Sequence, residues 1–296
     1  MKDESGRVFS KPATWPPFAQ KAGLFVLFLA IGMAIFVFGN NYFSIFVTNR
    51  NPVYEGGLSA ALLIATLVLH WQPRLRAYAD LAYLFFVASF VIFVTTITAE
   101  PRDSLFNVLH VVTSTSRGMA IAKLFEVALA VVTILVLVRA YGIRLGSIYV
   151  QRGNLRWGLI LGLGVLVNFL SSALMFFAGR YSDPALLGDA LLWGLVFSLA
   201  NGFMEELWLR ALFLRRLVPL IGGGGAILLT ATWFSLMHMG AVYFQPIAIP
   251  FFLANLIPFA LAWGYVMKKT DSLIGPSLMH AASDLFLFIA TLASAG

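Results

Sequence analysis

Long apolar runs without charged residues recur along this 296-residue chain. The longest extends from Leu217 to Met267 and contains no Asp, Glu, Lys or Arg. A membrane-spanning helix needs about 20 mostly apolar residues. The strands of a membrane barrel would instead alternate apolar and polar residues over segments of about 10. The continuous runs therefore predict an all-α fold, a polytopic bundle of transmembrane helices.

The charge-free runs give nine candidate spans, so we expect eight or nine helices that cross the membrane. The fourth candidate contains charged residues, which makes it the weakest, and a re-entrant segment is its alternative. The pair Gln245-Pro246 predicts the break between the seventh and eighth candidates. The candidates lie near residues 22–40, 56–72, 80–98, 119–138, 157–178, 188–216, 225–243, 247–267 and 272–292.

Composition supports a membrane protein and excludes other classes. Hydrophobic residues make up 60% of the chain and charged residues 11%, whereas soluble domains have about 25% charged residues. Such a chain has too few polar groups to cover a globular surface, which excludes an ordinary cytosolic enzyme, a disordered protein and a nucleic-acid binder. The chain has no cysteine, which excludes a disulfide, a thiol nucleophile and a Cys-ligated metal.

The positions of the basic residues predict the orientation in the membrane. If residues 1–21 form a cytoplasmic tail, fifteen of the 20 Lys and Arg residues fall in inner segments. Cytoplasmic loops carry the excess of Lys and Arg in membrane proteins, so nine spans predict an inner N-terminus and an outer C-terminus. We expect an integral protein of a bacterial inner membrane. Four basic residues fall in outer segments and one inside the fourth span: Arg50, Arg102, Arg117, Arg180 and Lys123.

Ionisable residues gather inside the last spans, where they are costly and usually mark a functional site. Six of them form a cluster, and a rise of about 1.5 Å per residue places Glu205, His238, His280 and Asp284 near the middle of a hydrocarbon core about 30 Å thick. Three helices therefore deliver acid and imidazole groups to one layer. These residues are Glu205, Glu206 and Arg210 in the sixth span, His238 in the seventh, and His280 and Asp284 in the ninth.

The spacing of these residues predicts the directions in which their side chains point. Glu206 and Arg210 are four residues apart, so they share a helix face and can form an ion pair. Glu205 points about 100° away from Glu206 and is free to face a cavity. Asn201 lies one turn before Glu205 on the same face, where it can hydrogen-bond to the carboxylate.

A carboxylate with two histidines and a second carboxylate can activate a water molecule for attack on a carbonyl. The set can act directly, or it can hold a metal ion, because one Glu and two His are ligand types of catalytic zinc sites. These residues alone leave both alternatives open. The chain contains no Gly-x-Ser-x-Gly, no His-Glu-x-x-His and no phosphate-binding loop.

Three motifs in this order resemble those of the CPBP family of intramembrane proteases. The family includes the type II CAAX prenyl endopeptidases and bacterial relatives linked to bacteriocin self-immunity. The resemblance covers about residues 150–292, a CPBP-like catalytic transmembrane domain, and leaves residues 22–140 as additional N-terminal spans. The motifs are Glu205-Glu206-x-x-x-Arg210, Phe234-x-x-x-His238 and His280-x-x-x-Asp284.

The resemblance implies an endopeptidase that cleaves a membrane-associated, CAAX-type protein or peptide. It implies that Glu205 is the general base, assisted by His238, and that His280 stabilises the oxyanion. Glu206 and Arg210 would pair and orient the site. We favour the scheme without a metal, a glutamate protease; a zinc ion held by Glu205, His238 and His280 is the alternative.

The last motif position departs from the family pattern, because Asp284 stands where the prenyl endopeptidases often have Asn. An ionised Asp cannot donate a hydrogen bond to an oxyanion. Asp284 would do so only when protonated, and it would otherwise orient His280 or bind a metal.

Two other functions remain open from the residues. In a proton-coupled transporter, buried Glu, His and Asp carry protons, although we find no internal repeat of the kind that builds many transporters. A non-catalytic immunity or scaffold protein would bind a partner without cleaving it. We also expect a polar cavity that opens to the inner leaflet, near a basic cluster that can attract anionic lipids: Arg215, Arg216, Lys268 and Lys269.

Overall fold

The computed structural model describes residues 17–39, 51–240 and 249–295, and these residues form a helical bundle without strands. The expected break at Gln245-Pro246 and most of the expected tail lie outside the described residues. The first helix begins at Phe18, inside the predicted tail. The main helices are α1 (Phe18–Gly32), α2 (Pro52–Trp71), α3 (Arg76–Ile97), α4 (Ala99–Val108), α5 (Ser116–Ala140), α6 (Leu155–Phe177), α7 (Pro184–Glu205), α8 (Leu214–Met237), α9 (Ile249–Thr270) and α10 (Ile274–Ala295).

Two π-helical turns extend these helices, and three short 3₁₀ turns follow or connect them. The π-helical segment η1 continues α1, and η4 continues α7 without a break. The bounds are η1 Met33–Val37, η2 Leu145–Ile148, η3 Ala178–Arg180, η4 Glu206–Ala211 and η5 His238–Gly240.

Eight helices in the described residues are long and apolar enough to cross a membrane. The protein is therefore an integral membrane protein of the polytopic helical class, as the sequence predicts. The fourth expected span is the unbroken 25-residue helix α5 rather than a short re-entrant segment. Helix α9 matches the eighth expected span but is not among the eight. Helix α4 has only 10 residues and was not expected as a helix.

Side-chain caps explain where several helices begin. Asn51 accepts a hydrogen bond from the backbone N–H of Tyr54, and Pro52 follows it in the first turn. The side chains of Thr115, Asn154 and Asp183 accept backbone N–H groups at the starts of α5, α6 and α7. These caps satisfy N–H groups that have no partner within their own helix.

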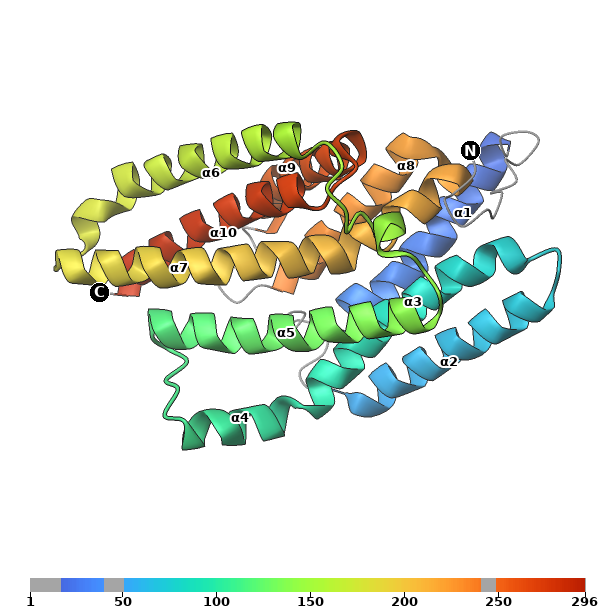
Figure 1. Cartoon of the computed structure of the whole chain (residues 1–296), viewed down its shortest axis with the longest axis horizontal. Helices are drawn as coiled ribbons and strands as arrows, with labels where there is room; N and C mark the ends of the chain where they lie inside the picture. Colours follow the sequence, from blue (N-terminus) through green and yellow to red (C-terminus); the bar gives the residue numbers. More distant parts are fainter. Residues whose placement is uncertain (1–16, 40–50, 241–248, 296) are drawn as a thin grey trace.

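The helices arrange so that α10 lies between α6 and α7, while α5 runs beside α7 in the same direction (Figure 1). Helix α8 packs against α1 and α9, and α2 forms a hairpin with α3. The core of the bundle surrounds η4, in which all six residues are buried. Ser116 on α5 donates a hydrogen bond to Asp189 on α7, and the Arg117 guanidinium lies 5.8 Å from the ring of Trp193.

The run Gly222–Gly225 is mostly helical. Only Gly222 departs from helical geometry, with φ 81° and ψ 163°. A positive φ of this size strains residues that carry a Cβ, so the chain turns at this glycine and continues as helix to Met237.

Two loops far apart in the sequence are joined by hydrogen bonds, and we call them the 149–154/270–273 junction. The backbone N–H of Asn154 donates to Thr270 O at 2.6 Å, and that of Leu273 donates to Tyr149 O at 3.1 Å. The Ser272 hydroxyl adds a bond to Gln151 O at 3.0 Å. The junction thus connects the start of α6 with the start of α10.

Candidate active site

The six ionisable residues come together where α7, α8 and α10 meet. Glu205 ends α7, Glu206 and Arg210 lie in η4, His238 follows the last residue of α8, and His280 and Asp284 lie along α10. Five of the six side chains are largely buried. The exception is His238, of which 24% is exposed, compared with 7% of the Glu205 side chain. His238 is therefore the most exposed of the six side chains.

A close crossing of α7 and α10 brings the acids to the histidine. A Cβ at Gly202 would lie 2.7 Å from Ser277 O and 2.9 Å from Ala281 N. Only glycine allows the two backbones to approach this closely. The crossing lies one turn before Glu205, so the following residues of α7 and η4 face His280.

Glu206 forms the structural centre of the site. Its carboxylate pairs with Arg210, as the four-residue spacing predicts, and its Oε1 lies 2.9 Å from His280 Nδ1. Both Glu206 and Arg210 are fully buried. A carboxylate only accepts hydrogen bonds, so Nδ1 of His280 carries the proton in this contact and Nε2 faces away from Glu206.

Glu205 faces the two imidazoles, away from the Glu206–Arg210 pair. Its Oε2 lies 3.6 Å from His238 Nε2 and 3.7 Å from His280 Nε2. These separations exceed a direct hydrogen bond. Within the described residues, Glu205 Oε2 is buried and accepts no hydrogen bond.

The tautomer of His238 follows from its own helix. Nδ1 lies 2.8 Å from Phe234 O, a carbonyl that can only accept, so Nδ1 carries a proton. In the neutral ring, Nε2 is then an acceptor directed toward Glu205. Phe234 also packs its ring 4.3 Å from the His238 ring, which fixes the orientation of the imidazole.

Asp284 is linked to the site through Asn201. Asn201 Nδ2 donates to Asp284 Oδ2 at 2.9 Å, and Asp284 Oδ1 lies 3.6 Å from His280 Nε2. The sequence places Asn201 on the same helix face as Glu205. Its hydrogen bond to Asp284, on another helix, was not indicated by the spacing. The bond connects α7 and α10 one turn from Glu205.

Trp263 on α9 belongs to the site, although no feature of the sequence pointed to it. Its ring stacks on the His280 ring at 4.3 Å and an interplanar angle of 11°. The Arg210 guanidinium lies 5.2 Å from the Trp263 ring and 4.6 Å from the Phe234 ring. Aromatic faces attract cations, so these rings hold the buried guanidinium as well as the imidazole.

The described residues contain no group of three His, Cys, Asp or Glu side chains arranged to hold a metal ion. A zinc ion on Glu205, His238 and His280, which the sequence left open, stays an alternative.

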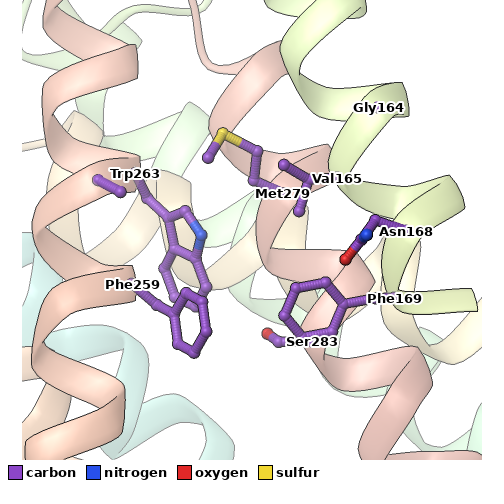
Figure 2. Close-up of a pocket in the computed structure, with 9 residues that line it drawn as sticks. Gly164, Val165, Asn168, Phe169, Phe259, Trp263, Met279 and Ser283 are labelled. Carbon is purple, nitrogen blue, oxygen red and sulfur yellow. The ribbon is translucent and has the colours of Figure 1, made fainter. Parts of the chain in front are cut away.

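A pocket of about 320 Å³ lies beside the site, between α6, α9 and α10 (Figure 2). The basic residues expected near a cavity do not line it. Arg215 instead pairs with Asp271, with its guanidinium 4.5 Å from the Tyr149 ring. The cavity expected at the inner leaflet stays a prediction.

A comparison with protein families identifies the region that contains these residues. Residues 187–286, about a third of the chain, match the family described as "Type II CAAX prenyl endopeptidase Rce1-like". The match includes all six ionisable residues, Asn201 and Trp263. No curated protein and no solved structure gave a significant match.

Proposed function

We propose that this membrane protein, whose residues 187–286 are a type II CAAX prenyl endopeptidase Rce1-like domain, is an intramembrane endopeptidase. It would hydrolyse a peptide bond in a membrane-associated protein or peptide of the CAAX type, in a bacterial inner membrane. The observation that carries the proposal is the buried carboxylate of Glu205, 3.6 Å and 3.7 Å from two imidazole nitrogens within a helical bundle.

Glu205 acts as the general base in this proposal. Glu205 Oε2 and His238 Nε2 both accept hydrogen bonds and lie 3.6 Å apart, so one water molecule beside them can contact both. That water donates its protons to the two acceptors, and its oxygen lone pair attacks the scissile carbonyl. Glu205 takes the proton as the new C–O bond forms and then returns it to the leaving amine.

His280 stabilises the negative charge that develops on the carbonyl oxygen. Glu206 holds Nδ1 of His280, so the protonated ring donates from Nε2 on the side of Glu205. Trp263 keeps the ring in this orientation by stacking. A donor oriented before the reaction stabilises an oxyanion without reorganisation during the step.

The substitution Glu205→Gln tests the proposal, because it keeps the size of the side chain and removes the base. We expect cleavage to fall by at least about 100-fold while the amount of folded protein in the membrane stays unchanged. The measurement compares newly exposed peptide termini in the membrane proteins of cells that express each form.

Glu100→Gln on the surface of α4 is the matched control and should cleave like the unaltered protein. Equal cleavage by the Glu205→Gln protein would contradict the assigned base. A biological effect that survives in the Glu205→Gln protein, without any cleavage by the unaltered protein, would favour a scaffold.

A further inference from the structure

The pocket between α6, α9 and α10 opens on the outside of the bundle, halfway along a transmembrane helix. Gly164 and Asn168 of α6 are exposed where they line it, and 41% of Phe259 on α9 is exposed. Asn168 lies thirteen residues after Leu155, the start of α6, which corresponds to about 20 Å along the helix. A group within the bilayer can therefore enter the pocket from the side.

The pocket shares a wall with the candidate active site. Trp263 lines it together with Phe169 and Phe259, and the ring of Trp263 stacks on His280 (Figure 2). Ser283, which also lines the pocket, donates its hydroxyl to His280 O at 2.7 Å. An occupant is thus separated from the His280 ring by one indole ring.

Asn168 supplies a polar group at this otherwise largely aromatic and aliphatic pocket. Figure 2 shows its carboxamide extending from α6 toward the residues around Ser283. Within the described part of the chain, the Asn168 side chain makes no hydrogen bond. An amide without a partner is costly in the bilayer, so its position at a pocket indicates a polar ligand group.

We propose that this pocket is a substrate subsite that takes an apolar side chain of the peptide, while Asn168 hydrogen-bonds to the peptide backbone beside that side chain. The inference rests on the proposed peptidase function and adds a specificity site to it. A peptide that is extended for cleavage exposes backbone groups, and inside a membrane each needs a partner. The aromatic walls contact the apolar side chain, and the Asn168 amide hydrogen-bonds to the peptide backbone.

Gly164→Phe tests the apolar part of the subsite. Gly164 lines the pocket and a Cβ there would meet no atom within 4 Å, so a larger side chain has space to extend into the pocket. Gly57→Phe on α2 is the matched control, because Gly57 is also exposed in a transmembrane helix with open space at its Cβ.

The probe is a set of membrane-anchored synthetic peptides that differ at one position among Ala, Leu, Phe and Trp, placed at successive positions around the cleaved bond. The unaltered protein in liposomes should prefer a large apolar residue at one of these positions. Gly164→Phe should shift that preference toward Ala by about tenfold or more in kcat/KM. Gly57→Phe should leave it unchanged.

Asn168→Leu tests the polar part with a side chain of similar size. Loss of a hydrogen bond made equally to substrate and transition state should raise KM by about tenfold and leave kcat unchanged. Asn168→Gln should restore part of the lost affinity, which a merely structural role of Asn168 would not predict.

The outcomes separate this inference from the proposed function. If the unaltered protein cleaves the peptides but Gly164→Phe keeps the same preference, the subsite is wrong and the peptidase stands. The same holds if lipid acyl chains alone occupy the pocket, because the preference would again stay unchanged. If no peptide is cleaved by the unaltered protein, the proposed function and the subsite fail together.

Discussion

Glu205 and Glu206 are neighbours in the sequence with opposite surroundings. Glu206 is held by Arg210 and His280, whereas Glu205 faces His238 and His280 at distances beyond a direct hydrogen bond. The first arrangement is fixed by ion pairing and the second is open to a reacting molecule. Their positions therefore predict different consequences of substitution.

Arg210→Met should destabilise the protein as well as inactivate it. The change leaves the fully buried Glu206 carboxylate without its ion-pair partner, and removal of one member of a buried pair costs about 3–5 kcal/mol. Denaturant titration of the purified protein in detergent measures the free energy of unfolding. Arg102→Met, at an exposed pair with Asp103, should change it by less than about 1 kcal/mol. Equal stability of the two variants would contradict a structural role for the buried pair.

Asp284→Asn should keep most of the activity, and Asp284→Leu should lose it. The Asn amide oxygen still accepts from Asn201, whereas Leu leaves the Asn201 amide without its acceptor and removes the polar group beside His280. We expect a loss below about tenfold for Asn and of about 100-fold or more for Leu. The measurement compares the cleavage rates of the two purified variants. Similar rates would contradict a polar role of Asp284.

At the scale of elements, the crossing of α7 and α10 at Gly202 determines whether the acids reach His280. Gly202→Val would force the helices apart, because its Cβ would lie within 3.0 Å of the α10 backbone. We expect a loss of about 1–3 kcal/mol in the free energy of unfolding together with loss of cleavage. Gly188→Val, on the same helix with nothing within 4 Å, is the control. Full activity of the Gly202 variant would show that the close crossing is not required.

The sequence predicted which helices carry the site better than how they pack. Hydropathy and spacing place Glu205, His238 and His280 at one depth and predict the Glu206–Arg210 pair. The same patterns contain no information on which helices are neighbours within the bilayer. The contact of Trp263 with His280 and the bond from Asn201 to Asp284 depend on that lateral arrangement, so neither could be derived.

The boundaries of helices were hardest to predict near glycine and in the π-helical turn. Gly222–Gly225 is helical apart from its first residue, since neighbouring helices compensate for the poor helix propensity of glycine. The π-helical turn η4 depends on the packing around it and has no distinct sequence pattern.

For the whole molecule, the number of crossings decides which side of the membrane holds the C-terminus. Eight helices qualify as spans and α9 is the expected ninth. Helix α1 begins toward one end of the long axis of the molecule and α10 ends at the other (Figure 1). This arrangement agrees with an odd number of membrane crossings. A reporter that is active only outside the cytoplasm, fused after Gly296, should therefore be active. Activity of a cytoplasmic reporter at that position would contradict nine crossings.

The 149–154/270–273 junction lies outside the apolar spans, yet it bears on chemistry inside them. Its hydrogen bonds anchor the first turn of α10, and His280 follows only six residues after Ile274. The immersion depth of the imidazole is thus set by polar loop contacts at the membrane border. A thicker or thinner lipid layer would tilt or reshape the outer helices. The distance along the membrane normal between the start of α6 and His280 would stay constant.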